Sequence, residues 1–595
     1  MTQASQRAAD NETRIASLWG ATLLLSRRRV LQTALGASAL ALTSGLLAAC
    51  GGDDDEDSGG DGGDTSEPDP TATTAASDES EPTATTATET MGEPVSGGRL
   101  VVGYTEPPTM DPRVSGATIA WRLFYNLFDT LVVQEAETGE IVPGLATSWE
   151  ISPDGLLFAF NLRDGVTFHD GTPFNAEAVK FTYDSILEPE LKSLTAIGYL
   201  GPYESAVVVD DLTVEINFSE QYAPFLNNLS HSVLAPVSPT AVEEYGEDFG
   251  FNPVGTGPFM FREWNEQVSM VFEKNPDYNW PLAVYKHEGP AYLDEIEIKF
   301  IPEATTILGT LENGETDLID GVPPQEVERL QNDEGYQVLL PSVPGSPQVL
   351  PLNATRFPTD DLLVRQAILY AVDMETIIDT LWFGSRRAAQ GPLSSPTWSY
   401  NPAVEEMYPY DTDRATELLE EAGWEMGSGG VLEKDGERMH LEYITTSGIQ
   451  GQAGELVQAY LAAVGIEVNL QQLEYAATAA AYLASEHNIA RIYFSHTDPV
   501  VLTTLYHSVN IMGTNFNRTM KEDATLDEML SDATSELDPE VRRQMYEDIQ
   551  AYIMEQALII PLWEETVFWG ANASVHGLHF QPLGGVWFYD VWKDA

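Results

Sequence analysis

The chain has 595 residues, several times the length of a typical domain, so we expect more than one hydrophobic core. Its 93 Asp and Glu residues against 29 Lys and Arg residues give a net charge of −64, which repels nucleic-acid phosphates and argues against a nucleic-acid partner. The single cysteine, Cys50, excludes an intrachain disulfide and a multi-cysteine metal cluster.

The first 49 residues have the pattern of an export signal. Arg27 and Arg28 precede an uncharged apolar run at 34–49, which is short for a membrane-spanning helix. The two arginines resemble a twin-arginine signal, and the sequence LAAC ending at Cys50 resembles a lipobox, in which the cysteine becomes the lipidated first residue of the mature protein. A buried helix or an uncleaved anchor is the alternative, and in either case the body lies outside the membrane.

Residues 50–98 are predicted to form a tether. From Gly51 to Glu93 the chain consists of small, polar and acidic residues with almost no large apolar side chain, so it cannot bury enough surface to offset the entropy lost on ordering. The acidic run at 53–57 is expected to be solvated, because nothing around it supplies the rigid loop of spaced ligands that calcium requires.

The most informative stretch of the body contains two turns and the start of a helix. The turn sequence SPDG at 152–155 precedes residues 156–162, whose apolar side chains alternate and predict a strand. A second turn at 163–165 and an extended run at 166–169 predict another strand, joined to the first by a hairpin. Asn175 is predicted to cap the helix that follows.

This stretch, VPGLATSWEISPDGLLFAFNLRDGVTFHDGTPF at 142–174, resembles the family 5 extracellular solute-binding proteins, the peptide- and nickel-binding components of ABC importers. Two further segments resemble the same family in the same order, VRQAILYAVD at 364–373 and PYDTDRATELLEEAGW at 409–424. PVGTGPF at 253–259 resembles a family turn that returns the chain to the first lobe, and it lacks the third glycine and the lysine-serine pair of phosphate loops.

The resemblance implies an α/β fold with two lobes, of the periplasmic-binding-protein type (type II, cluster C), with an extra subdomain in lobe I and two hinge crossings. The crossings are expected near Gly345 to Leu352 and near Leu558 to Trp563. The expected division is signal 1–49, tether 50–98, lobe I first part 99–124, extra subdomain 125–238, lobe I second part 239–348, lobe II 349–560 and lobe I return 561–595.

The resemblance also implies a function. The protein is expected to be a monomeric lipoprotein, held at the extracytoplasmic face of the cell membrane by a lipid on Cys50. It is expected to capture a small solute, a peptide or a peptide-like molecule, in a cleft between the lobes and to pass it to an ABC permease. No catalysis, cofactor or metal is expected.

The periodicity of the remaining segments is consistent with two α/β lobes. Residues 207–218 alternate around Asp210-Asp211 and predict a hairpin. Other segments repeat the order strand, helix, strand, which is typical of crossover units. These segments are 293–301, 303–312 and 317–319 in lobe I, and 441–446, 454–464 and 466–470 in lobe II. Helices capped by Asp373, by Asp411 or Thr412, and by Asp538 are also predicted.

The segment RIYFSHTDP at 491–499 is the predicted ligand site, because it begins as a strand and ends in a turn that can face a cleft. It resembles the family segment W-x-x-DY-x-DP, whose first aspartate pairs with the ligand's amino group in peptide binders. Aligned on Asp498-Pro499, that position is Ser495, which carries no charge and puts a free-amine peptide in doubt. The predicted ligand-binding residues are Tyr493, Phe494, Ser495, His496, Asp498, Trp398, Tyr104 and Asn353.

Each of these residues also has a structural interpretation. Tyr493 and Phe494 equally fit a core position, and Asp498 fits a turn-stabilising role. The sequence contains none of the common hydrolase, zinc-protease or phosphate-loop motifs. His576 and His579 stand three apart in an extended stretch, where an ordinary structural role is expected. The alternatives are a family member that binds a sugar, one that binds a metal complex through His496, and a secreted hydrolase that uses carboxylates of the cleft.

Overall fold

The computed structural model describes residues 93–136, 138–511 and 516–594. The predicted signal and almost all of the predicted tether, with Arg27, Arg28 and Cys50, lie outside the described residues. Within the described ranges, no helix is both long and apolar enough to cross a membrane.

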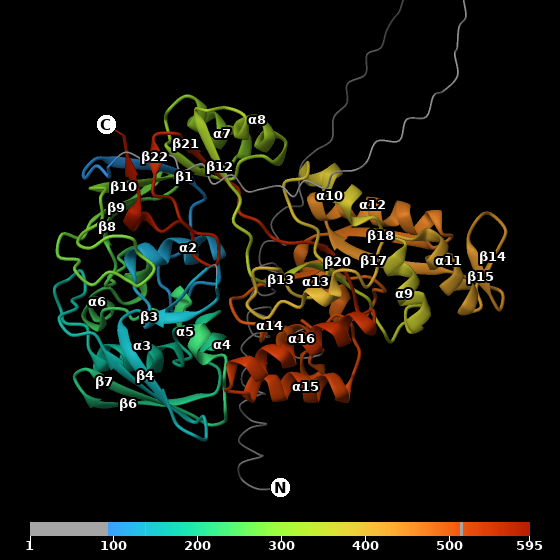
Figure 1. Ribbon diagram of the computed structural model, residues 1–595, viewed down its shortest axis with the longest axis horizontal. Coiled ribbons are helices and arrows are strands. Elements are labelled where there is room, and N and C mark those ends of the chain that lie inside the picture. Colours follow the sequence, from blue (N-terminus) through green and yellow to red (C-terminus); the bar gives the residue numbers. More distant parts are fainter. Residues whose placement is uncertain (1–92, 137, 512–515, 595) are drawn as a thin grey trace, which may run out of the picture. The chain divides into compact units, whose positions relative to one another are not determined.

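Lobe I is built on a seven-stranded mixed sheet (Figure 1). Its strand β1 (Arg99–Tyr104) pairs in parallel with β10 (Glu295–Phe300) and with β11 (Leu318–Asp320), which follow one another along the chain with helix α7 (Ala304–Glu312) between them. This confirms the predicted crossover. The other strands pair antiparallel with their neighbours and complete the order β12-β21-β11-β1-β10-β9-β8; they are β8 (Phe259–Asn265), β9 (Ser269–Lys274), β12 (Tyr336–Leu339) and β21 (Trp569–Asn572).

A second, antiparallel sheet forms the extra subdomain of lobe I, in the order β4-β5-β7-β6. Its strands are β4 (Ala146–Ile151), β5 (Leu157–Leu162), β6 (Tyr203–Asp210) and β7 (Thr213–Phe218). The predicted strand at 156–162 and the predicted hairpin at 207–218 are confirmed. The predicted strand at 166–169 is wrong, because β4 and β7 occupy both edges of β5, and the run forms only an isolated bridge between Thr167 and Pro173.

Helix α3 (Ala176–Ile186) follows this stretch and begins as predicted. The Asn175 side chain accepts a hydrogen bond from the backbone N–H of Ala178 at 3.1 Å, which satisfies one of the free donors of the first turn. The other helices of lobe I are α2 (Thr118–Leu127), α4 (Ala196–Leu200), α5 (Phe225–Leu229), α6 (Pro239–Tyr245) and α8 (Val327–Gln331).

The glycines of the sequence GTGP allow two backbones to approach closely. A Cβ on Gly255 would lie 2.1 Å from the carbonyl oxygen of Leu127, so only glycine fits there. The turn also holds Thr256 against the buried carboxylate of Asp129, at 3.1 Å, and Trp280 donates to the same carboxylate at 3.1 Å. Burial raises the pKa of Asp129 to about 7. The turn therefore has a packing role.

Lobe II contains three small sheets. One is made of the short antiparallel strands β14 (Glu425–Met426), β15 (Leu432–Lys434) and β16 (Glu437–Arg438). The remaining two have longer strands. One has the order β19-β13-β20, with β13 (Gly345–Pro351) antiparallel to both β19 (Ile492–Ser495) and β20 (Ile559–Trp563). The other pairs β17 (His440–Thr446) in parallel with β18 (Glu467–Leu473), which α12 (Ile449–Ala463) connects, as predicted. The longer helices around them are α9 (Leu362–Tyr370), α10 (Met374–Trp382), α11 (Thr412–Glu421), α13 (Tyr475–Leu483), α15 (Ala524–Ser535) and α16 (Pro539–Glu555).

Two connecting segments, 340–344 and 564–568, join the lobes. They are hydrogen-bonded to each other, from the Val343 N–H to the Glu565 carbonyl at 2.9 Å and from the Val567 N–H to the Pro341 carbonyl at 3.0 Å. The residues predicted as crossings instead form β13 and β20, which pair with each other inside lobe II. We define lobe I as 99–339 with 569–594, lobe II as 345–563, and the two segments between them as the connectors.

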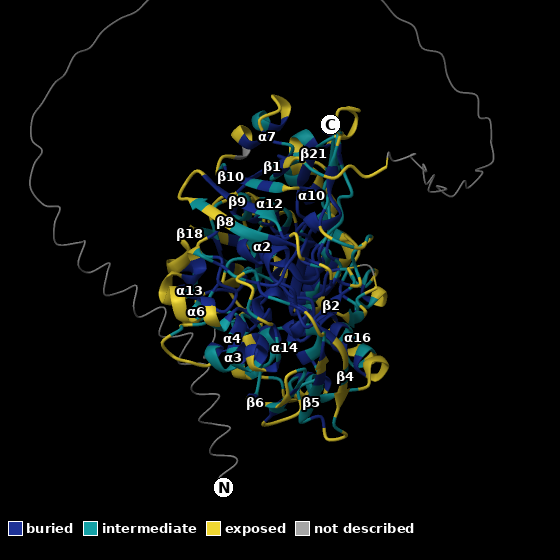
Figure 2. Cartoon of the chain, turned by 90° about the vertical axis from the view of Figure 1, so that its left-hand side faces the viewer, coloured by how far each residue is buried: buried dark blue, intermediate teal, exposed yellow. Residues whose placement is uncertain are grey.

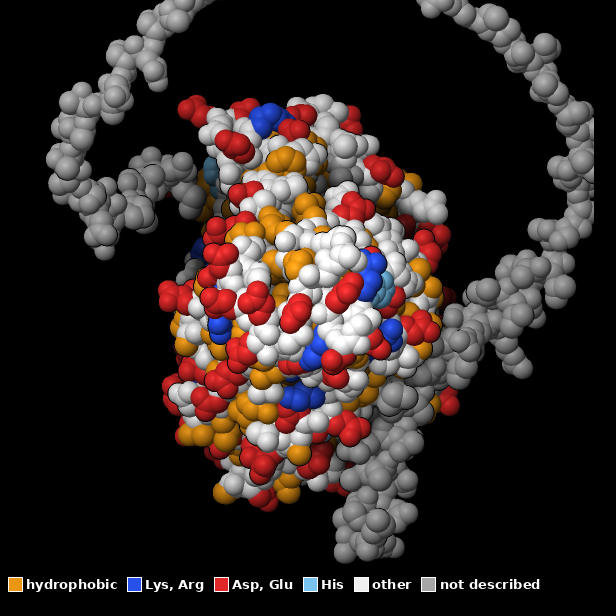
Figure 3. Space-filling model, turned by 90° about the vertical axis from the view of Figure 1, so that its right-hand side faces the viewer, with side chains coloured by type: hydrophobic (Ala, Val, Ile, Leu, Met, Phe, Trp, Pro, Cys, Tyr) orange, Lys and Arg blue, Asp and Glu red, His pale blue; other side chains and the backbone are white. Residues whose placement is uncertain are grey.

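Each lobe has its own large hydrophobic core. The lobe I core extends from the seven-stranded sheet into the extra subdomain, and the lobe II core surrounds β13, β17 and β20. Buried residues fill the interior, whereas helices such as α13 expose one face (Figure 2). Acidic side chains are spread over the face shown in Figure 3, with few basic ones among them, as the net charge predicts.

Candidate functional site

The predicted site segment lies beside the connectors. Ser495 is the last residue of β19 and pairs in register with Gly345, the first residue of β13. The segment 491–499 therefore leaves its sheet at the point where the chain enters lobe II. This position is suited to sensing a movement of one lobe against the other.

Two of the predicted site residues, from different lobes, lie near the same arginine. Burial raises the pKa of Tyr104 in lobe I above its ordinary value and that of Tyr493 in lobe II to about 12. The charge of Arg122, from α2, acts on both hydroxyls and opposes the rise. The Tyr104 hydroxyl is fully buried and donates to the Ile119 carbonyl at 2.9 Å, and the Tyr493 hydroxyl is hydrogen-bonded to Ser495.

A polar network that the sequence did not reveal surrounds Tyr493. Arg386 is ion-paired with Glu565 of the second connector, and its guanidinium lies 3.8 Å from the ring centroid of Trp382. Gln348 donates to Glu565 at 2.8 Å and accepts from Arg491 at 3.0 Å. The network thus ties β13 and β19 to a connector, and nothing in the spacing of these residues predicts it.

Asp498 binds other residues of the protein. Its carboxylate is fully buried and accepts two hydrogen bonds from Arg542 of α16, at 2.8 and 2.6 Å. Asn227 of lobe I also donates to it. Burial by itself would raise the pKa of Asp498, but the charge and hydrogen bonds of Arg542 outweigh burial and hold it below the ordinary value. Asp498 therefore anchors a lobe II helix and a contact between the lobes.

His496 makes the next contact between the lobes. Its ring stacks on Tyr199 of lobe I, with the ring centroids 4.7 Å apart, and Tyr199 in turn lies 4.5 Å from His231. Burial lowers the pKa of His496 to about 4, so the stacked ring is neutral near pH 7. Gln134 of lobe I donates to the Thr497 carbonyl at 3.4 Å. His496 and Asp498 thus hold lobe I and line neither interlobe cavity.

The remaining predicted site residues lie in different surroundings. The amide of Asn353 is fully buried and bonded to Ser485 and His487 within lobe II, which gives it a structural role. Phe494 packs edge-on against Phe516. Trp398 lines a cavity of about 440 Å³, together with Arg542 and other residues from both lobes.

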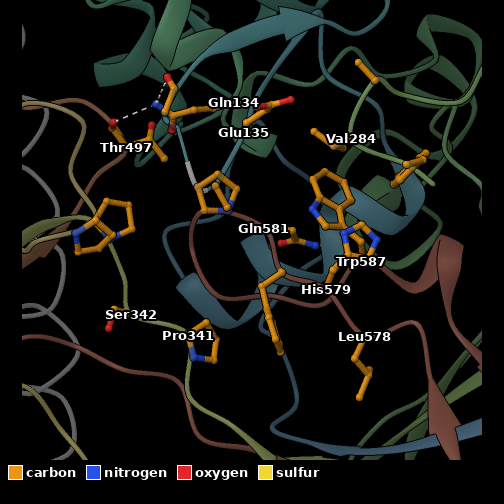
Figure 4. Close-up of a pocket in the computed structure, with 18 of the residues that line it drawn as sticks. Gln134, Glu135, Val284, Pro341, Ser342, Thr497, Leu578, His579, Gln581 and Trp587 are labelled. Carbon is orange, nitrogen blue, oxygen red and sulfur yellow. Dashed lines mark hydrogen bonds between the residues drawn. The ribbon is translucent and has the colours of Figure 1, made fainter. Parts of the chain in front are cut away.

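A larger cavity of about 780 Å³ opens between the lobes beside the connectors (Figure 4). Lobe I supplies most of its wall, the first connector supplies Pro341, Ser342 and Pro344, and lobe II supplies Pro396 and Thr497. The lining mixes charged, polar and aromatic groups, among them Glu135, Lys286, His579, Gln581 and Trp587. Gln581 also donates to the Arg122 carbonyl at 3.1 Å, which links this cavity to the residues around Tyr493.

The cavity has the properties of a small-molecule site. Its volume lies within the range of about 300–1,000 Å³ that is common for ligand pockets. It is lined from both lobes and from the connectors, so its shape depends on the angle between the lobes. No cluster of three or more His, Cys, Asp or Glu residues suited to a metal ion occurs among the described residues.

Comparisons with known proteins agree with this arrangement. A family model described as bacterial extracellular solute-binding proteins, family 5 Middle, matches residues 140–512. The glutathione-binding protein GsiB of Salmonella typhi is 27% identical over 497 residues, which cover 81% of this chain and 92% of the relative.

Solved structures match over most of the chain. The ABC transporter-associated periplasmic binding protein DppA from Helicobacter pylori, in complex with the peptide STSA, has a TM-score of 0.67 and 27% identity, covering 84% of this chain and 99% of that one. NikA from Brucella suis, in complex with Fe(III)-EDTA, has a TM-score of 0.73 and 27% identity, covering 83% and 100%. These structures confirm the predicted α/β fold with two lobes.

Proposed function

Because the chain belongs to the bacterial extracellular solute-binding proteins of family 5, the substrate-binding components of ABC importers, we propose that it captures a peptide-like solute in the 780 Å³ cavity. The proposal is carried by one observation: the cavity beside the connectors is lined by residues of both lobes, and these include polar and aromatic side chains. A solute in this cavity contacts both lobes only when the lobes are closed. The protein therefore binds the solute more tightly in the closed state than in the open state, and binding shifts the population toward the closed state.

Two relatives support a peptide-like solute. GsiB is a glutathione-binding protein, and the DppA structure contains a four-residue peptide. A metal complex, as in the NikA structure, has less support, because His496 is stacked on Tyr199 and bonded through its Nδ1 to the Asp498 N–H. None of the eight predicted site residues lines the 780 Å³ cavity. Trp398 lines the 440 Å³ cavity, and we assign the other seven to the support of the site.

Protein purified without denaturation is expected to carry one solute molecule in native mass spectrometry. After unfolding, dialysis and refolding, added tripeptides should raise the melting temperature, because a ligand that binds only the folded state stabilises it by mass action. The solute should be recovered chemically unchanged. Recovery of a cleaved product would instead support the hydrolase alternative, and the absence of any binding to the refolded protein would contradict the proposal.

A bulky side chain in the cavity separates specific binding from surface binding. Ala136 is exposed and lines the cavity, so Ala136→Trp should fill it without disturbing the core and lower peptide affinity at least tenfold. Ala463, exposed at the last residue of α12, lines neither cavity described above, and Ala463→Trp should leave the affinity unchanged. Equal affinities for the two variants would place the solute elsewhere.

We also propose that a lipid on Cys50 holds the protein at the extracytoplasmic face of the membrane, beside its permease. The proposal rests on the sequence LAAC and on the stretch that follows it. This stretch consists of acidic, small and polar residues and is long enough to serve as a tether. The variant Cys50→Ser should appear in the soluble fraction of fractionated cells, whereas the wild-type protein should sediment with membranes. Membrane retention of the variant would favour an uncleaved anchor.

A further inference from the structure

Two histidines close together in the sequence have different surroundings. His579 lines the 780 Å³ cavity (Figure 4). His576 lies in the short strand β22 (Val575–His576), stacks on Trp592 at 4.1 Å, and is 3.1 Å from the carboxylate of Asp594. It lines neither of the interlobe cavities. The pair therefore does not form a joint site, and His579 alone is placed to meet a solute.

A buried carboxylate supports His579 from behind. Asp590 is only 4% exposed, and its oxygens lie 2.7 Å from Nε2 of His579 and 2.7 Å from Nδ1 of His287. The backbone N–H of Lys286 donates to both oxygens, at 3.1 and 3.2 Å. Burial by itself would raise the pKa of Asp590, but the interactions with His579 and His287 outweigh burial and lower it. Asp590 is therefore an ionised acceptor.

His287 is the second partner of Asp590. Its Nδ1 faces the Asp590 carboxylate and its Nε2 faces the Pro290 carbonyl at 3.1 Å. Both partners are hydrogen-bond acceptors, so the His287 ring is held between them. The rings of Tyr292 and Tyr589 stack on it, each with its centroid 4.1 Å away, and fix its orientation.

The arrangement leaves one acceptor on the cavity wall. Nε2 of His579 lies 2.7 Å from a carboxylate oxygen of Asp590, a close contact that lacks the alignment of a hydrogen bond. We place the ring hydrogen on this nitrogen because it faces an acceptor. With the ring hydrogen on Nε2, Nδ1 of His579 keeps its lone pair. No hydrogen bond to this Nδ1 is formed by the residues that the structure describes. A neutral imidazole nitrogen accepts a hydrogen bond from an ammonium or an amide N–H.

We propose that Nδ1 of His579 accepts a hydrogen bond from the amino group of the bound solute, with Asp590 and His287 as positioning residues. The inference rests on the proposed function and names the part of the peptide that is recognised. The proposal places recognition of the amino group in lobe I, because the lobe II position expected to bind it is occupied by Ser495, which carries no charge. Glu135 adds a negative charge to the same cavity, and Lys286 offers a partner for the solute's carboxylate.

The test measures the preference for a free amino group. Wild-type protein, unfolded and refolded to remove solute, is incubated with the equimolar set of Ala-Xaa-Ala tripeptides and with its N-acetylated counterpart, and bound masses are read by native mass spectrometry. The wild-type protein should prefer free tripeptides about tenfold or more, because a hydrogen bond to a charged donor is among the stronger ones. A ratio is used because a general loss of stability does not change it.

Two substitutions distinguish the nitrogens of His579. In His579→Gln the amide reaches the position of Nε2, which keeps the Asp590 contact and removes the cavity acceptor, so the preference should fall to within about twofold of unity. In His579→Asn the amide oxygen lies near the position of Nδ1, so part of the preference should return. His576→Gln is the matched control and should retain the wild-type ratio.

The outcomes separate the inference from the proposed function. If wild-type protein binds tripeptides without a preference, or if His579→Gln keeps the wild-type preference, amine recognition by His579 is wrong while peptide capture stands. If the refolded wild-type protein binds neither set of tripeptides, the peptide-like solute and its amine subsite are both refuted. If His576→Gln loses the preference as well, the effect belongs to the local fold and the inference is again refuted.

Discussion

Replacement of Arg542 by methionine is expected to destabilise lobe II by about 3–5 kcal/mol. The guanidinium is 5% exposed and makes both of its terminal hydrogen bonds to Asp498, which is fully buried. Its Nε also donates to the Ala533 carbonyl at 3.0 Å, which joins α16 to α15. Removing the arginine leaves the Asp498 charge buried without its cationic partner, and this is the main cost. Urea unfolding followed by tryptophan fluorescence measures it.

An exposed ion pair provides the control. Arg414 contacts Glu417 at 2.9 Å with 44% of its side chain exposed, and Arg414→Met should cost no more than about 1 kcal/mol. The double variant Asp498→Asn, Arg542→Met should be more stable than the sum of its single variants, because the uncompensated charge is then absent. If Arg542→Met costs as little as Arg414→Met, the buried pair does not stabilise lobe II as described.

Replacement of Gly345 by alanine is expected to cost about 3 kcal/mol or more and to weaken solute binding. Gly345 opens β13 with a φ of +108°, a conformation that L-residues rarely adopt and that costs about 1–3 kcal/mol. A Cβ there would lie 2.4 Å from the backbone nitrogen of His496 and 2.6 Å from the Phe494 carbonyl oxygen. The substitution should therefore push β19 away from β13 beside the connectors and displace Thr497, which lines the 780 Å³ cavity.

Gly429→Ala is a control that has the backbone strain of Gly345→Ala without its steric clash. It also has a positive φ, +86°, but a Cβ on it would meet no atom within 4 Å. Gly429→Ala should cost about 1–2 kcal/mol and leave the affinity for tripeptides unchanged. Calorimetric titration and urea unfolding of both variants are the measurements. Equal losses of stability and affinity would mean that the approach of β19 to β13 is unimportant.

Local structure was predictable where a side chain marks the boundary of an element. Asp373 accepts from the Thr376 N–H at 3.1 Å and caps α10, and Asp538 accepts from the N–H groups of Glu540 and Val541 ahead of α16. These bonds join residues two or three apart, so the sequence contains both partners together. The helix starts at Asn175 and Asp411 follow the same rule.

Contacts between distant residues were not predictable in this way. The run at 166–169 has the pattern of a strand, but β4 and β7 had already taken both edges of its expected partner. Asp498 reads as a turn residue or a ligand contact, and its real partner Arg542 stands 44 positions later. For His579, the features that matter are Asp590 and His287, and the second of these lies far back in the chain.

The order of the strands has a consequence for how the chain is completed during synthesis. Strand β21 lies between β12 and β11 in the lobe I sheet, yet residues 569–572 supply it, close to the carboxyl end. Lobe II is one continuous segment and has all of its strands once the ribosome has passed residue 563. Lobe I, although it begins first, keeps two unpaired strand edges until residues 569–572 have been made. A chain terminated between residues 563 and 569 therefore contains all the strands of lobe II and a lobe I sheet with two unpaired strand edges, which are prone to pair with other chains.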